Sequence, residues 1–450
     1  MPGMAFDSIT NLDLPNNKLI LFKTKKALKP DASYSDPYWL REEHSQGLFK
    51  VPSPEFIGRP ENGPAVVITC SIEINGENFS IDAPLQYKWT DPVKGELSRP
   101  FEIVPPVFVN LNQPVYVFPD KKPKMVSMLV KSSSGSPVEG SAKLTLPSNW
   151  KSEPASMPVS IQKRGEEVKL DFMVYPSTGE GSFKLGAQVD IGSVSYDRAV
   201  ETIQYDHIPF QTLLPKAKAS LVRIEVKKEG QLIGYIAGAG DEVPAALRNL
   251  GYEVWEMKNE EVTPANLKKL DAVVLGVRAL NTNERLRYFM PDLLKYVENG
   301  GTLITQYNTN FDLEIEKDKF SPYPLNISRE RVTEENSEVR LLLPDHPALN
   351  YPNKMKAEDF NGWVQERGLY FPDKWDPKFE AVLSMNDTGE PARNGSLLVA
   401  KYGTGHYVYT GISFFRELPE GVAGAYKLFA NLSSLGKQPK PKNQKLKTAK

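Results

Sequence analysis

The feature that most constrains the fold of this 450-residue chain is a change of sequence pattern near residue 221. Before that point the chain is rich in proline and carries short segments, such as residues 168–174, in which apolar and polar side chains alternate. Alternation with a period of two is typical of strands with one buried face. After residue 221, short apolar runs alternate with helical segments. We therefore predict a multidomain chain in which all-β sandwiches precede an α/β domain.

Proline and turn signals set the predicted boundaries. Turn sequences rich in glycine, serine and proline, at 134–137 and 176–179, separate the alternating segments at a spacing typical of sandwiches. Pro105 and Pro106 fix the backbone and remove two amide donors, so they indicate a stiff hinge between two modules. The predicted parts are a β-sandwich at 1–104, a second β-sandwich at 105–204, a linker at 205–220, an α/β domain at 221–436 and a disordered lysine-rich tail at 437–450.

The segment after residue 221 has the pattern of a parallel sheet. Four apolar runs, at 232–237, 252–255, 271–276 and 302–305, are separated by helical stretches. Continuous apolar strands are typical of a parallel sheet that helices cover on both faces. The pattern predicts a flavodoxin-like three-layer domain, in which ligands bind at the carboxyl ends of the strands.

Charge and hydropathy exclude several classes of partner. The formal net charge is −1, so no overall electrostatic attraction favours nucleic acid. No segment approaches the roughly 20 consecutive apolar residues that span a bilayer, so we expect no membrane span. The first seven residues lack the basic and then apolar pattern of a signal peptide, and they are more typical of a cut inside a longer protein.

Cysteine, histidine and glycine usage bears on redox chemistry, metals and cofactors. The chain has one cysteine, Cys70, and this excludes an intrachain disulfide. Cys70 lies in the apolar run 65–70, which indicates a buried core residue. No two of the four histidines have the close spacing of a zinc-binding helix. Gly238 and Gly240 begin a dinucleotide-type motif, but Val243 stands where its third glycine belongs. We therefore predict neither a metal nor a cofactor.

Polar side chains follow the predicted strands at the edge where a parallel sheet binds ligands. Carboxylates, amides and a guanidinium gather there, and a later segment at 359–368 adds a tryptophan. Such a set offers bidentate hydrogen bonds and an aromatic face, which suit a polyhydroxylated ligand. The alternative is that these residues cap loops or pair with one another. The candidate ligand-binding residues are Asp241, Glu242, Arg278, Asn281, Gln306, Asn308, Asn310, His346, Trp363, Glu366 and Arg367.

Five short motifs carry a first resemblance to a known family. They are GYIAG at 234–238, DAVVLG at 271–276, NGGTL at 299–303, DHP at 345–347 and YGTGHYVYTG at 402–411. They resemble the class I glutamine-amidotransferase-like superfamily, particularly its trehalose-utilisation (ThuA-like) branch. Active amidotransferases carry a cysteine nucleophile at the turn after the fourth strand, where this chain reads QYNTN at 306–310. Without a thiolate the acyl-enzyme route of a glutaminase does not carry over.

A second set of motifs is spread over most of the chain. They are DPYWLR at 36–41, IGRPEN at 57–62, VYVF at 115–118 and YDHIP at 205–209. They resemble the C-terminal part of large bacterial PIG-L/LmbE-like deacetylases, and residues 105–204 also resemble NEW3-type immunoglobulin-like modules. In that family a separate N-terminal domain holds zinc through a His-Pro-Asp-Asp segment, which this sequence does not contain. The resemblance implies a catalytic deacetylase domain in a longer protein, a carbohydrate ligand, and a periplasmic or extracellular location.

Three hypotheses of function follow from the residues and the resemblance. The first is a non-catalytic accessory region that positions the catalytic domain of a carbohydrate-active protein and binds glycan in the α/β domain. The second is a hydrolase in which His346 acts with a carboxylate, Glu366 or Asp241, as acid and base. The third is a purely structural scaffold in which every polar residue named above caps a loop.

Overall fold

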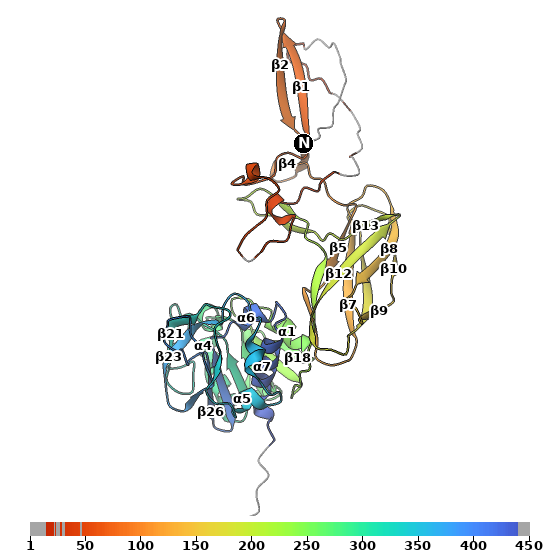
Figure 1. Cartoon of the computed structure of the whole chain (residues 1–450). Coiled ribbons are helices and arrows are strands. Elements are labelled where there is room, and N and C mark those ends of the chain that lie inside the picture. The colour runs from red at the N-terminus through yellow and green to blue at the C-terminus, as the bar shows by residue number, and fades with distance from the viewer. Residues whose placement is uncertain (1–14, 22, 24–27, 29–31, 46, 440–450) are drawn as a thin grey trace, which may run out of the picture.

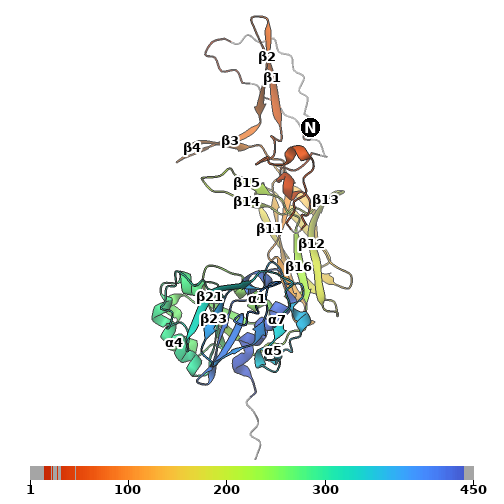
Figure 2. The same ribbon diagram turned by 60° about the vertical axis from the view of Figure 1, so that its left-hand side comes forward.

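The computed structural model describes residues 15–21, 23, 28, 32–45 and 47–439. Figure 1 and Figure 2 show three parts in a row, with thin hairpins at one end, a β-sandwich in the middle and a larger part with helices at the other end. The interpretation of the first seven residues, and that of the tail from residue 440 on, lie outside the described residues. No helix in the described part of the chain is long and apolar enough to cross a membrane.

The predicted sandwich at 1–104 is wrong for the residues that the structure describes. In place of packed sheets it has two separate two-stranded hairpins and two short 3-10 helices. A sandwich needs a second sheet to cover the apolar face of the first, but nearly all residues of β1 and β2 are exposed. The elements are η1 (Tyr38–Leu40), η2 (Pro54–Phe56), β1 (Val67–Ile74), β2 (Glu77–Pro84), β3 (Gln86–Asp91) and β4 (Gly95–Pro100).

The β1–β2 hairpin explains why the sequence predicted a sandwich with a buried Cys70. Paired residues of an antiparallel hairpin share one face, and the register places most of the apolar side chains on a single face, with Val67 on the other. That face is uncovered, so Cys70 is exposed and the prediction of a buried core cysteine is wrong. The apolar face consists of Ile68, Cys70, Ile72, Ile74, Phe79, Ile81 and Ala83.

The middle part is a β-sandwich, as the sequence predicted. Alternate residues of its two sheets point inward and form one core, which includes Phe118, Trp150 and Phe172. The first sheet has the order β10 (Met157–Ile161), β8 (Val138–Thr145), β12 (Gly181–Ile191), β16 (Lys218–Arg223), β6 (Val115–Phe118), with β13 (Val194–Tyr196) beside β12. The second has the order β5 (Val107–Leu111), β7 (Lys124–Ser132), β11 (Glu167–Tyr175), β9 (Lys151–Glu153).

The predicted linker at 205–220 contains strands. β15 (Gln211–Leu213) pairs with β14 (Glu201–Ile203), and β16 begins at Lys218 and lies in the sandwich sheet between β12 and β6. The sandwich therefore draws on residues beyond the predicted end at 204. Sequence alternation could not show this, because β16 pairs with strands far away along the chain.

The C-terminal part is built on a seven-stranded sheet. Its first four strands stand in the order 2-1-3-4, and five neighbouring strands from β18 to β27 are parallel. β26 and β24 complete the sheet in antiparallel pairs. The sheet order is β18 (Glu253–Glu256), β17 (Leu232–Ile236), β19 (Ala272–Leu275), β20 (Thr302–Thr305), β27 (Gly405–Thr410), β26 (Leu397–Tyr402), β24 (Phe379–Ala381).

Helices cover both faces of this sheet. Alternate strand residues, such as Val274 and Leu275, belong to two different apolar clusters. Helices α1, α5 and α7 contribute to the first cluster and α2, α3 and α4 to the second. The helices are α1 (Val243–Asn249), η3 (Asn259–Glu261), α2 (Pro264–Leu267), α3 (Ala279–Thr282), α4 (Leu286–Glu298), α5 (Pro347–Asn350), η4 (Ala357–Phe360), α6 (Phe414–Glu417), α7 (Ala423–Ser434) and η5 (Leu435–Lys437).

Two short antiparallel pairs complete this part of the chain. β21 (Leu325–Val332) pairs with β23 (Gly368–Trp375) through several register shifts, and β22 (Arg340–Leu341) pairs with β25 (Leu383–Ser384). A bridge from Gly368 to Ile412 joins β23 to the segment just after β27. The β21–β23 pair therefore lies against the carboxyl edge of the parallel strands.

The sandwich and the seven-stranded sheet share one apolar core. In β6 and β16, Tyr116 and Leu221 point into the sandwich core, whereas Val115, Val117 and Val222 point into the core that contains α1 and α7. All four residues of β6 are consequently buried. A strand that is apolar on both faces is typical of burial on both faces. The junction is thus a packed interface.

Candidate functional site

Asp241 follows β17, and it holds the carboxyl edge of the sheet together. One carboxylate oxygen accepts from the Tyr235 hydroxyl (2.8 Å) and from the Val243 N–H (3.0 Å). The other accepts from the Val277 N–H (2.8 Å) and from the side-chain amide of Gln306 (3.4 Å). The four hydrogen bonds of this carboxylate are therefore all made to groups of the protein itself. Its neighbour Glu242, by contrast, is exposed at the start of α1 and makes no capping bond.

Two predicted site asparagines are buried loop anchors. The side-chain oxygen of Asn308 accepts from the Leu280 N–H (2.9 Å), and its amide nitrogen donates to the Gln306 carbonyl (2.7 Å). The side-chain oxygen of Asn281 accepts from the Thr309 N–H (3.0 Å). These bonds tie the loop after β19 to the loop after β20. Both side chains therefore satisfy backbone groups, as the alternative of loop capping predicted.

An aromatic stack lies at the same edge, beyond the ends of β20 and β27. The ring of Tyr307 stacks on Phe415 (5.5 Å between ring centroids) and also contacts the tilted ring of Tyr370 (5.7 Å). Phe311 meets Tyr370 edge-on (6.2 Å between ring centroids), and the Arg416 guanidinium lies 4.9 Å from the centre of the Phe415 ring. Burial raises the pKa of Tyr307. Offset stacks of this kind stabilise a loop cluster while leaving ring edges at the surface.

Backbone strain gathers at this edge. Four residues other than glycine have left-handed backbone there: Arg278 (φ 58°), Asp312 (φ 53°), Gln365 (φ 65°) and Tyr370 (φ 51°). None of the residues at 306–310, where an amidotransferase would place its nucleophile, has a positive φ. Residues held in such conformations often cluster at functional sites. Of these four residues, Arg278 comes soonest after a parallel strand, β19.

Glu366 is partnered by an arginine. Its carboxylate accepts from Nε of Arg416 at 2.6 Å, and its backbone carbonyl accepts from the Ser413 hydroxyl (2.7 Å) just beyond β27. The side chain of Glu366 is only 12% exposed. An acid held in this way balances the charge of Arg416.

Trp363 and Arg367 do not line a crevice. Trp363 is 4% exposed, packs against Phe360 and Phe414, and donates its indole N–H to the Asp359 carbonyl (3.1 Å). Arg367 is 3% exposed and donates to the carbonyls of Ser337 and Phe360. The prediction that Trp363 offers a face to a sugar ring is therefore wrong, because its faces are filled by neighbouring rings.

His346 lies away from the other candidates. Its Nδ1 accepts from the Ala348 N–H (3.0 Å) at the start of α5, and its Nε2 lies 3.3 Å from a carboxylate oxygen of Glu380. Burial lowers the pKa of His346, and the nearby His406 stands at the start of β27. The carboxyl-edge residues lie beyond the other end of β27, roughly 17 Å away at the rise of a β-strand. The hypothesis that His346 acts with Glu366 or Asp241 on one substrate is therefore wrong.

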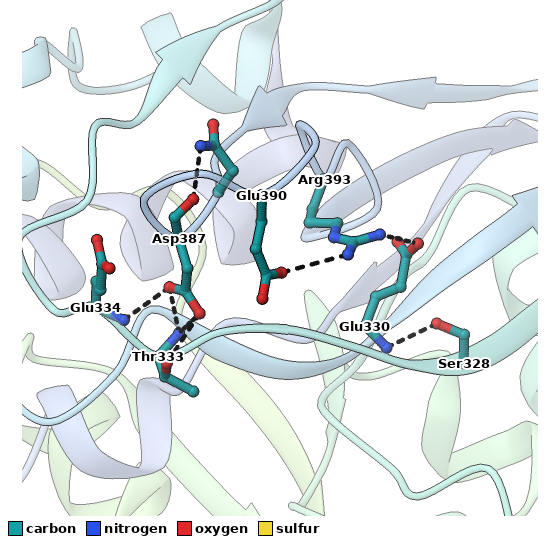
Figure 3. Close-up of polar contacts among 8 residues, drawn as sticks. Ser328, Glu330, Thr333, Glu334, Asp387, Glu390 and Arg393 are labelled. Atoms are coloured by element: carbon teal, nitrogen blue, oxygen red, sulfur yellow. Dashed lines mark hydrogen bonds and ion pairs between the residues drawn. The ribbon is translucent and has the colours of Figure 1, made fainter.

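A second polar group lies where β21 ends (Figure 3). The Asp387 carboxylate accepts from the N–H groups of Thr333 and Glu334 (both 2.8 Å) and from the Thr333 hydroxyl (2.8 Å). The Arg393 guanidinium donates to the Glu330 carboxylate (2.5 Å). Burial raises the pKa of Asp387, but these backbone donors outweigh it, so that the pKa lies below its usual value. The Asp387 carboxylate thus fixes the turn after β21, whereas Nε of Arg393 is buried without a hydrogen-bond partner among the described residues.

Two cavities are lined by residues other than the predicted ones. One, of about 310 Å³, opens between the sandwich and the C-terminal part and is lined by Ser182, Asp359, Val364 and Gly424 among others. The other, of about 420 Å³, lies beside Tyr288 at the start of α4. Neither contains a predicted site residue. Within the described residues, no three His, Cys, Asp or Glu side chains come together as a metal site.

Several residues of the edge escaped the sequence analysis. Phe415 and Arg416 come shortly after β27, so the rule that placed Arg278 and Gln306 at strand ends would have found them. Tyr370 could not be found in this way, since it lies in an antiparallel strand. Glu417 directly follows Arg416, so the same rule would have found it. It is fully buried, and burial raises its pKa to about 8.

Comparison with known proteins gives distant structural likenesses only. No known protein family matches the sequence, and no curated protein is similar to it. A β-galactosidase from Rahnella sp. R3 aligns with 14% identity over 47% of this chain and 32% of its own, with a TM-score of 0.30. The exo-β-1,4-mannosidase Op5Man5 from Opitutaceae bacterium strain TAV5 aligns with 10% identity over 46% and 35%, with a TM-score of 0.28. This chain thus spans about a third of the length of either enzyme.

Proposed function

We propose that this chain is a non-catalytic accessory region of a carbohydrate-active protein, and that it holds a catalytic domain of the PIG-L/LmbE-like N-deacetylase type in a fixed position. In this proposal the sandwich is a NEW3-like immunoglobulin-type module. The C-terminal part is a flavodoxin-like domain of the glutamine-amidotransferase superfamily, close to its ThuA-like branch. The motifs at 36–41, 115–118 and 402–411 support the assignment.

The observation that carries the proposal is the shared core at the junction. Three valines of the sandwich sheet, Val115, Val117 and Val222, point outward from the sandwich. Their side chains are buried among residues of α1 and α7. Burying an aliphatic side chain of this size stabilises by about 1.5–3 kcal/mol, and Lys124 adds a hydrogen bond to the Asn249 carbonyl (2.6 Å). Relative motion of domains is the default where interfaces are small and polar. An apolar junction of this kind instead favours a fixed orientation of the sandwich relative to the C-terminal part. We call these two parts together the rigid arm.

The polar residues of the carboxyl edge also support a non-catalytic role. Asp241, Asn281 and Asn308 are occupied by backbone groups, and Glu366 is paired with Arg416. A general base has to reach the proton that it removes, and these groups are committed elsewhere. Binding of a glycan at this edge is the second part of the proposal, and it would use the aromatic stack and Arg278 in place of Trp363.

Two measurements test the proposal. Small-angle X-ray scattering of the purified chain should fit one elongated particle in which the sandwich and the C-terminal part keep a fixed orientation. The zinc-supplemented protein should release neither acetate from N-acetylated sugars nor ammonia from glutamine. Scattering data that fit only a flexible ensemble would contradict the proposed rigid arm. Turnover that a point substitution such as Glu417→Gln abolishes would show that this chain is itself an enzyme.

A further inference from the structure

The apolar face of the β1–β2 hairpin is open to solvent. Ile74 (54%), Phe79 (50%) and Ile81 (55%) each keep at least half of their surface exposed. On the other face, the Thr69 hydroxyl donates to the Asp82 carboxylate (2.7 Å). Antiparallel strands with one apolar and one polar face commonly pack the apolar face on a core, and an isolated two-stranded hairpin is only marginally stable in water. The apolar face therefore needs a cover, and the described residues of the same chain leave it exposed.

The area of this face suits a small protein interface. Two paired strands of eight residues give a face about 27 Å long and about 10 Å wide. Its exposed side chains offer roughly 500 Å² of surface, the size of exposed apolar patches that often serve a function. Two such faces packed together would bury about 1,000 Å², which reaches the lower bound of a specific interface. A second copy of the face is thus large enough to cover the first.

The charges of the face also fit a second copy. The ionised side chain on this face of the hairpin is Glu77, which is paired with Ile74 at the tip. When one hairpin is turned end over end on the other, the two Glu77 carboxylates lie at opposite ends of the interface and do not repel each other. The formal net charge of the chain is −1, so two copies repel each other only weakly. A partner selected by charge would find little to pair with on this face.

The hairpin also lies where a second copy can reach it. In Figure 1 and Figure 2, β1 and β2 project from the end of the molecule that is remote from the seven-stranded sheet. Two hairpins can therefore meet without contact between the bulkier parts.

We propose that the apolar faces of two β1–β2 hairpins pack on each other and join two copies of this chain as a twofold-symmetric dimer. Twofold symmetry is the commonest arrangement of soluble oligomers, because one self-complementary patch serves both copies. In the dimer, two rigid arms extend from one shared hairpin contact. The inference does not depend on the proposed function.

Sedimentation equilibrium of the whole chain tests the dimer. An interface of this size predicts a dissociation constant of roughly 1–100 µM. We therefore expect the mass of one chain well below that range and twice that mass well above it. Ile81→Lys places a charge in the middle of each apolar face, so it should weaken dimerisation at least tenfold. Ser80→Lys is the matched control, because Ser80 is the neighbouring residue of β2 and lies on the polar face. It should dimerise as the wild type does.

Cys70 provides a second measurement. It is exposed, it is the one cysteine of the chain, and it is paired with Ile81 in the middle of the apolar face. Packed sheets lie about 10 Å apart, so the two Cys70 thiols of a dimer are within reach of a short bis-maleimide. Crosslinked dimers should form in the wild type and in Ser80→Lys, and should be at least tenfold rarer in Ile81→Lys. Labelling of dilute protein with N-ethylmaleimide controls for the reactivity of the thiol.

Four outcomes would overturn the inference. The first is the mass of one chain at every concentration, and the second is an Ile81→Lys variant that dimerises as tightly as the wild type. The third is an equal loss of dimerisation in Ile81→Lys and Ser80→Lys. The fourth is growth beyond a dimer, which would indicate pairing through open strand edges.

Discussion

Glu417 shows how much a single buried acid can matter. One carboxylate oxygen accepts from the Val364 N–H (3.0 Å), and the other has no partner among the described residues. Burial raises the pKa of Glu417 to about 8, the Val364 N–H and Arg367 oppose this, and Glu335 and Glu366 add to it. The folded protein therefore keeps this acid protonated up to nearly pH 8.

This pKa predicts how stability depends on pH. Because the folded pKa lies above the unfolded value of about 4.3, the stabilisation present below pH 4 is lost as the pH rises towards 8. Glu417→Gln cannot ionise and can still accept from the Val364 N–H. We expect it to match the wild type near pH 4.5 and to be more stable by about 2–4 kcal/mol at pH 9. Urea unfolding at several pH values measures this, and a constant difference between the two proteins would contradict it.

At the scale of elements, the end of β21 depends on Asp387. Its carboxylate satisfies two backbone N–H groups and a hydroxyl of the adjoining turn, and it is 8% exposed. Asp387→Ala should therefore lower the free energy of unfolding by about 2–4 kcal/mol at pH 7, since it leaves buried donors unmatched. The depressed pKa means that the wild type loses this advantage as the pH falls through that pKa, below about 4.

The neighbouring residue supplies the control for Asp387. Thr388 is exposed, and its hydroxyl donates to the exposed Glu334 carboxylate (2.7 Å). Thr388→Ala should change the free energy of unfolding by no more than about 0.5 kcal/mol. Chemical unfolding of both variants at pH 7 and pH 3 tests the pair, and similar losses for both would show that the carboxylate contributes nothing special.

The same scale explains what the sequence could predict. Alternation in residues 168–174 predicted a strand, and the sandwich around it is present. Residues 68–74 alternate equally well but lie in an uncovered hairpin. Alternation shows that a strand has an apolar face and leaves open what covers that face. At the carboxyl edge, strand ends predicted where polar residues would gather. They could not show that Asn308 and Asp241 are used by backbone N–H groups, which depends on how loops far apart in the chain meet.

At the scale of the whole molecule, one glycine decides whether the sandwich and the C-terminal part pack closely. Gly421 has a φ of 78°, and a Cβ added there would lie 2.7 Å from Val222 and 3.0 Å from Val115. Both valines belong to the sandwich, whereas Gly421 lies just before α7. Valine side chains have little rotamer freedom to move aside. A methyl group at this position would therefore push the two parts away from each other.

Gly389 provides the comparison that isolates this contact, because it has the same φ of 78° and nothing within 4 Å of an added Cβ. Gly389→Ala should cost about 1–2 kcal/mol, the strain of alanine in left-handed backbone. Gly421→Ala adds overpacking to the same strain, typically another 1–3 kcal/mol. We also expect residues 107–436 of the wild type to unfold in one thermal transition and Gly421→Ala to unfold in two, which differential scanning calorimetry would resolve. Equal losses and one transition in both variants would mean that the two parts unfold independently of their contact, and the rigid arm would lose its physical basis.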